Sequence, residues 1–103
     1  MRHFHRTHLS PADVMAEADA FFSALGLAKV AAAGRSGTWR GVIGTPEVTA
    51  TVQLTARPEG GHYTFVEATT DQMGESRLDR NVTRFFVAIH RKAEPSHTLE
   101  AAY

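Results

Sequence analysis

The sequence feature that most constrains the fold is an unbroken alternation of apolar and polar side chains over residues 47–56. Valine, alanine and leucine occupy every second position, and glutamate, threonine and glutamine occupy the positions between them. Because successive side chains of a β-strand point to opposite faces, this pattern predicts a strand with one buried and one polar face. A strand of this kind is typical of an antiparallel sheet that is covered on one side only.

An amphipathic helix near the C-terminus can supply that cover. Four apolar residues follow one another at spacings of four, three and four, which places them on one face of a helix: Leu78, Val82, Phe85 and Ile89. Phe86 widens this apolar face. The spacing predicts a helix over about residues 75–93, and Pro95 ends it.

The remaining segments predict a second helix and four more strands. Ser10 is a suitable N-cap, Pro11 suits the first helical position, and Gly26 is a natural end for the helix between them. We expect the other strands at residues 1–8, 27–33, 38–44 and 62–70, with a turn at 35–37, a break at 45–46, a hairpin loop at 57–61 and a loop at 71–74. In the strand at 62–70 either face could be buried, because Tyr63 and Phe65 lie on one face and Val66 and Ala68 on the other.

The expected order is therefore strand, helix, four strands, helix. Because both helices are amphipathic and the sheet has one polar face, both helices should pack on the same side of an antiparallel sheet. This arrangement is an α+β two-layer sandwich. A chain of 103 residues forms one domain, which we place at residues 1–95, followed by a mobile tail at 96–103.

The composition of the chain argues against several classes of function. Formal net charge is zero, which argues against bulk attraction to nucleic acid or to an anionic membrane. The chain has no cysteine, which excludes disulfides, thiol catalysis and cysteine-based zinc sites and fits a reducing compartment. Residues 1–8 are too polar for a secretory signal, and the apolar run at 20–33 is too interrupted to span a bilayer. We therefore expect a cytoplasmic protein that does not insert into membranes.

Three segments carry a resemblance to a known superfamily. FHRTHLSPADVMAEADAF resembles the first strand and following helix of the START-like (SRPBCC, helix-grip) superfamily, which includes polyketide cyclases and plant lipid carriers. VTATVQLTARPEGGHYTFVEAT resembles its long late hairpin, and RLDRNVTRFFVAIHRK resembles its closing helix. The likeness spans residues 4–92, and the chain resembles an abbreviated member, because it is shorter than the usual fold by a further hairpin and helix.

The resemblance implies a ligand-binding space between the sheet and the last helix. The side chains that would line it are large and apolar: Phe21, Trp39, Leu54, Phe65 and Phe85. The alternative, which we favour in so short a chain, is that these side chains fill the space as a core. We assign no catalytic residue and expect no cofactor.

Histidines and arginines form two further candidate sites. His3 and His5 would point the same way on a strand and could share a metal, but His8 faces the other side and no nearby acid completes the set, so we expect no specific metal site. Four arginines fall on the outer face of the last helix: Arg77, Arg80, Arg84 and Arg91. Because the polar face of an amphipathic helix must be solvated, we expect no specific nucleic-acid binding from them.

The function that we expect is non-catalytic binding of a small apolar ligand or a protein partner. One alternative is a cyclase- or isomerase-like enzyme that uses Glu67 or a histidine in a small pocket, and an inward Glu67 would favour it. Another is an accessory subunit or oligomerisation module. Five strands are too few to close a barrel, so an edge stays open, and we expect a homodimer formed through the sheet or its edge.

Overall fold

The computed structural model describes residues 1–44, 47–73 and 76–93, and every structural statement below concerns these residues. Along the chain the elements are β1 (Arg2–Thr7), α1 (Pro11–Ala24), β2 (Ala28–Ala33), β3 (Ser36–Ile43), β4 (Val48–Glu59), β5 (Tyr63–Thr70) and α2 (Arg77–Ala93). The predicted α+β class, with an antiparallel sheet of five strands and two helices, is confirmed. The predicted tail at 96–103, the break at 45–46 and Pro95 lie outside the described residues.

The strands are ordered β1-β5-β4-β3-β2, and each neighbouring pair is antiparallel. The long strand β4 is therefore central, and β1 and β2 form the two edges. The connection from β4 to β5 is shorter than the sequence predicted, because β4 runs on to Glu59 and β5 begins at Tyr63. Within it the φ angles of Gly60 and Gly61 are positive, at 65° and 78°. Such angles favour glycine.

Two expected boundaries were wrong. Arg57, Pro58 and Glu59 were expected in a hairpin loop, but they extend β4 and pair with β5. Pro58 is tolerated there because β3 begins opposite Thr55, so one side of β4 has no neighbouring strand at Pro58 and no N–H is needed. The expected turn at 35–37 is also too long, since β3 already begins at Ser36.

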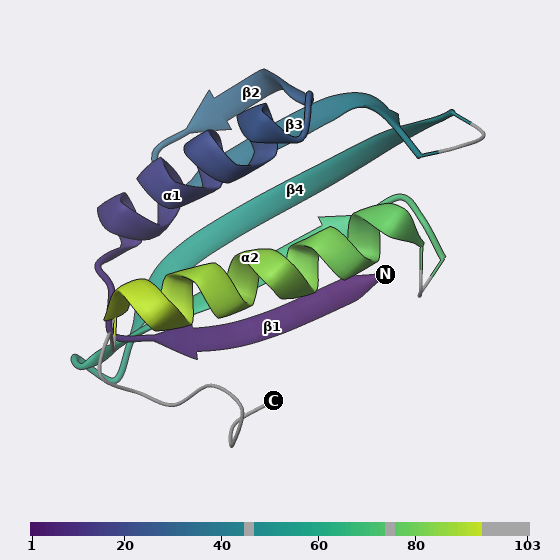
Figure 1. Cartoon of the computed structure of the whole chain (residues 1–103). Coiled ribbons are helices and arrows are strands. Elements are labelled where there is room, and N and C mark those ends of the chain that lie inside the picture. The colour runs from purple at the N-terminus through teal and green to yellow at the C-terminus, as the bar shows by residue number, and fades with distance from the viewer. Residues whose placement is uncertain (45–46, 74–75, 94–103) are drawn as a thin grey trace.

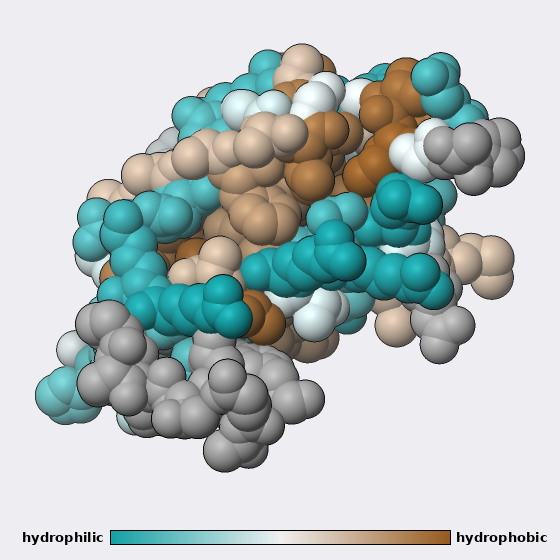
Figure 2. All heavy atoms as spheres, in the orientation of Figure 1, coloured by the Kyte–Doolittle hydropathy of each residue, from teal (hydrophilic) through white to brown (hydrophobic). Residues whose placement is uncertain are grey.

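Both helices lie across the same side of the sheet in Figure 1. α1 contacts β2, β3 and β4, whereas α2 contacts β1 and β5, so together they cover the width of the sheet. The helix at α1 begins as predicted, with the backbone N–H of Asp13 donating to the Ser10 side chain at 3.2 Å. Figure 2 shows this side of the molecule, where apolar atoms gather between the helices and polar atoms lie along α2.

The core lies between the helices and the sheet. The predicted apolar face of α2 is confirmed, since its four spaced residues are all fully buried: Leu78, Val82, Phe85 and Ile89. Phe22 of α1 links the layers, because its ring centroid lies 5.1 Å from that of Trp39 and 5.3 Å from that of Phe85. These aromatic contacts add to the apolar area that the two helices bury.

The residues that alternate with the core positions form the other face of the sheet, which we call the open face. On β4 the predicted alternation is confirmed from Ala50 to Ala56, where the apolar residues are buried and the polar residues between them are more exposed. It was wrong at Val48, which is 45% exposed at the start of the strand. On β5 the buried residues are Thr64, Val66, Ala68 and Thr70, so Tyr63, Phe65 and Glu67 belong to the open face. The structure thus decides the register that the sequence left open.

Candidate functional site

The five candidate ligand-binding residues do not gather in one place. Trp39, Leu54 and Phe85 are fully buried, and Phe21 packs against the same core while remaining partly exposed. Phe65 lies on the opposite, open face of the sheet. Only the first four residues could therefore border a space between the sheet and the helices.

Phe65 instead belongs to a surface cluster on β1, β5 and β4. We call this cluster the aromatic–arginine patch, and it consists of Phe4, Phe65, Arg2, Arg6 and Arg57. The ring centroids of Phe4 and Phe65 lie 5.5 Å apart. Phe4 is 53% exposed, which is unusual for a phenylalanine that sits in a sheet.

The patch is built by the strand register. Arg6 of β1 pairs with Phe65 of β5, which in turn pairs with Arg57 of β4, so the three side chains form one row across the sheet. The Arg57 guanidinium lies 4.8 Å from the Phe65 ring centroid, and the Arg6 guanidinium lies 5.3 Å from it. Arg2 lies 5.5 Å from the Phe4 ring in the same way. Cations at these distances are attracted to the aromatic ring faces.

The open face carries an excess of positive charge. Within the described strands its arginines are Arg2, Arg6, Arg40 and Arg57, and its acidic residues are Glu59 and Glu67. Arg2 pairs with Glu67 at 3.0 Å and Arg6 pairs with Glu59 at 2.8 Å. Within the described part of the chain, Arg57 has no acidic partner. Its guanidinium instead lies over the Phe65 ring.

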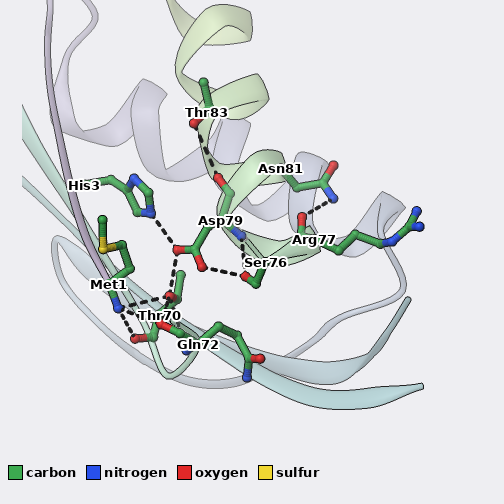
Figure 3. Close-up of polar contacts among 9 residues, drawn as sticks. All are labelled: Met1, His3, Thr70, Gln72, Ser76, Arg77, Asp79, Asn81 and Thr83. Atoms are coloured by element: carbon green, nitrogen blue, oxygen red, sulfur yellow. Dashed lines mark hydrogen bonds and ion pairs between the residues drawn. The ribbon is translucent and has the colours of Figure 1, made fainter. Parts of the chain in front are cut away.

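A second polar cluster ties the start of α2 to β1 and β5, and Figure 3 shows its contacts. Asp79 is 3% exposed. One of its oxygens lies 2.6 Å from His3 Nε2 and accepts the Thr70 hydroxyl at 2.8 Å, and the other accepts the Ser76 hydroxyl at 2.5 Å. Ser76 in turn accepts the backbone N–H of Asp79 at 3.1 Å, as a helix N-cap does.

These hydrogen bonds fix the charge of Asp79. Burial by itself raises the pKa of this carboxyl, but the hydrogen bonds from His3, Ser76 and Thr70 lower it by more. The pKa of Asp79 is therefore below its ordinary value, and the group is an anion at neutral pH. Because both of its oxygens are engaged, Asp79 holds α2 against the sheet edge.

An open pocket of about 400 Å³ lies beside this cluster, lined by Met1, His3, Asp79, Arg80 and Thr83. A histidine next to a buried carboxylate can act in proton transfer. Glu67 is the other acid that we considered from the sequence. It lies on the open face and accepts a hydrogen bond from Arg2, so it does not face the core, as the enzyme alternative would require.

His3 and His5 share one face of β1, as predicted, but they contact different partners. The His5 ring stacks on Phe86 with centroids 5.1 Å apart, and its Nε2 has no hydrogen-bond partner among the described residues. Burial, and to a smaller extent His90, lowers the pKa of His5. Among the described residues, no three side chains of a type that binds metals come together.

The arginines of α2 are exposed, in agreement with their expected position on the outer face of the helix. Arg80 borders the pocket beside His3, whereas Arg84 is exposed and distant from the open face. None of the described helices has the length and apolar character needed to cross a membrane.

We did not predict the aromatic–arginine patch from the sequence, although the alternation of its residues along two strands is visible there. Arg2, Phe4 and Arg6 alternate on β1, as do Tyr63, Phe65 and Glu67 on β5. Their meeting depends on the pairing of β1 with β5, which no local pattern indicates. A scan against protein-family models finds no match for this chain, and a search of curated proteins finds none either.

Proposed function

We propose that this protein is a non-catalytic binding domain and that it binds its partner on the open face of the sheet. The proposal takes the molecule as an abbreviated START-like two-layer sandwich, in which the helices cover one face and leave the other free. The observation that carries it is the aromatic–arginine patch. A sheet that presents an exposed Phe4 ring and a partly exposed Phe65 ring beside guanidinium groups has the composition of a binding surface, since aromatic residues and arginine are enriched at binding hot spots.

The chemistry of the patch defines the kind of ligand. The Phe4 and Phe65 rings offer flat apolar surface, and Arg57 offers a positive charge without an acidic partner among the described residues. A partner that carries flat aromatic groups together with negative charge would use both. A small apolar ligand in the interior has less support, because Trp39 and Phe85 are fully buried against other core side chains.

The non-catalytic part of the proposal rests on how the acids are used. Asp79 is bonded to three side chains at the start of α2, and Glu67 is paired with Arg2. In these positions the two acids serve as structural partners, and neither is placed as a poised general base.

The location of binding can be tested with 8-anilinonaphthalene-1-sulfonate, an aromatic anion, in an NMR titration. We expect shifts of the backbone amides of β1, β5 and β4 around Phe4 and Phe65, and weaker binding by Phe4→Ala and Arg57→Ala. The indole N–H of Trp39, which donates to Asp19 of α1, should keep its chemical shift. Shifts centred on Trp39 and Phe85, unaffected by the two substitutions, would place the binding site in the interior and reject the proposal.

A second copy of the chain is a further partner that we propose, at the β2 edge. All six residues of β2 are exposed, and Lys29 is its one charged residue. In an antiparallel pairing of β2 with β2 of another copy centred between Val30 and Ala31, Lys29 faces an alanine, so like charges do not meet. Light scattering over a range of concentrations tests this: a mass that stays that of one chain at every concentration would exclude the homodimer.

A further inference from the structure

We propose that the ligand of the open face is single-stranded nucleic acid, bound with little sequence preference. This inference rests on the proposed function and gives its ligand a chemical class. Proteins that bind single strands without reading their sequence combine aromatic side chains, on which bases stack, with positive groups that follow the backbone. The open face has both features, and it has them on adjacent strands of one sheet.

The first step is the geometry of the rings. Phe4 and Phe65 come from the neighbouring strands β1 and β5, with ring centroids 5.5 Å apart and planes inclined by 32°. Tyr63 continues the aromatic surface two residues before Phe65 and is 45% exposed. A sheet that carries aromatic rings on adjacent strands can stack two or three successive unpaired bases.

The second step is the placement of charge around the rings. Arg6 and Arg57 flank Phe65 in one row, and Arg2 lies beside Phe4. Guanidinium groups can bind phosphate in a bidentate manner or stack on a base through their flat faces. The two glutamates of this surface are each bonded to an arginine, which leaves the face with a net positive charge.

The third step is the rest of the open face, which is polar and almost free of acids. Beyond the patch, β4 presents uncharged hydrogen-bonding side chains between its buried positions: Thr49, Thr51, Gln53 and Thr55. These groups can donate to or accept from the edges of unpaired bases, or donate to phosphate oxygens. A purely apolar ligand would not use the arginines and threonines of this face, and a cationic partner would be repelled by its positive charge.

Single-stranded nucleic acid fits this surface better than a duplex. In a duplex the bases are stacked on one another and cannot lie on Phe4 or Phe65, so only the phosphates would contact the arginines. The inference concerns the open face and not the arginines of α2, from which we expect no specific binding. It also fits the zero formal charge of the chain, because the positive charge is local to one face.

Fluorescence anisotropy with a labelled fifteen-nucleotide oligothymidylate at low salt tests the inference. We expect binding that is stronger than to a duplex of the same length and that is roughly equal for oligouridylate. Phe4→Ala should weaken it about 10-fold through the loss of one stacking platform. Arg57→Ala should weaken it and reduce the slope of log affinity against log salt by about 0.7, the value for one phosphate contact on a single strand.

Two control variants match these substitutions. Arg84→Ala removes the same charge from the exposed side of α2, and Val42→Ala removes an exposed apolar side chain from the same open face. Neither should change the affinity for the oligonucleotide. Phe4 and Val42 are both more than half exposed, so both variants should fold, which circular dichroism verifies.

The possible outcomes separate the inference from the function on which it rests. Equal binding to duplex and single strand, or equal losses from Arg57→Ala and Arg84→Ala, would show only bulk charge attraction and overturn the inference. If the aromatic anion binds the patch and oligonucleotides do not, this inference fails while the proposed function stands. If light scattering shows a dimer that Phe4→Ala dissociates, the patch is an interface between copies and the inference fails.

Discussion

Removing the Asp79 carboxylate should destabilise the protein far more than removing its counterpart in the other helix. Both helices begin with a serine cap followed three residues later by an aspartate, Ser10 to Asp13 in α1 and Ser76 to Asp79 in α2. Asp13 is exposed, whereas Asp79 is 3% exposed and accepts hydrogen bonds from other elements. The two substitutions therefore share the effect on the helix N-terminus and differ in the contacts with the sheet.

The expected magnitudes follow from these contacts. Asp13→Ala loses the favourable interaction of a carboxylate with a helix N-terminus, about 0.3–1 kcal/mol. Asp79→Ala loses the same interaction and removes the closer acceptor of the buried Thr70 hydroxyl, which keeps only a contact of 3.4 Å to the Gln72 carbonyl; this loss costs about 1–3 kcal/mol more. The total of about 1.3–4 kcal/mol corresponds to a fall in melting temperature of roughly 5–30 °C for a domain of this size.

The pH dependence gives an independent check of this reasoning. Because the pKa of Asp79 is lowered in the folded state, the unfolded chain binds a proton first as the pH falls. The stabilisation is therefore present above the ordinary aspartate pKa of about 3.8 and is lost as the pH falls through the folded value. The difference in unfolding free energy between the natural protein and Asp79→Ala should shrink below about pH 4. Urea unfolding at pH 7 and pH 3 measures it, and equal effects of the two alanine substitutions, or a difference independent of pH, would refute the argument.

Three further predictions concern the core and the histidines. Phe85→Ala should cost about 3–5 kcal/mol of unfolding free energy in a urea titration, because the ring is fully buried and packs against Phe21 and Phe22 of α1; an unchanged midpoint would contradict the role of α2 as the cover of the core. Since the pKa of His5 is lowered on folding, the unfolded state takes up the proton first below about pH 6.5, so unfolding free energy should fall from pH 7 to pH 5. His5→Phe should flatten that dependence, and an identical slope in the variant would exclude His5 as its source. Zinc titration by calorimetry should give only weak binding, and a tight one-to-one isotherm abolished by replacing His3 and His5 would show a real metal site.

The periodic parts of the fold could be predicted from the sequence because their patterns have a single solution. The spacing of Leu78, Val82 and Phe85 permits one buried helix face, and the alternation in β4 permits one buried strand face. β5 offered two solutions, since apolar residues occupy both of its faces. Packing decides between them, because Val66 and Ala68 are small enough to lie beneath α2 while Phe65 remains on the open face.

The sites could not be predicted because they join segments that are distant in the chain. Asp79 and His3 are 76 residues apart in the chain, so no local pattern predicts their contact. Only the serine cap at Ser76, three residues from Asp79, is a local feature that the sequence could indicate. The patch needs three strands in the order β1, β5, β4, which the sequence pattern does not specify. Pro58 also led us to expect a loop at Arg57, which belongs to the patch, because a proline usually marks a loop. In the structure Pro58 lies in β4 at a position where β3 no longer runs beside it.

The pairing of β1 with β5 also has a consequence for the order of folding. β2, β3, β4 and β5 follow one another in the chain and are neighbours in the sheet, so they can pair by closing short loops. β1 is synthesised before the other four strands, yet its partner is β5, so Arg2 can pair with Thr69 only after the strands between them have been made. Contacts between such distant residues form slowly. Since Phe4 lies on β1 and Phe65 on β5, the two rings come together only when these two strands pair, and the patch does not exist before that step.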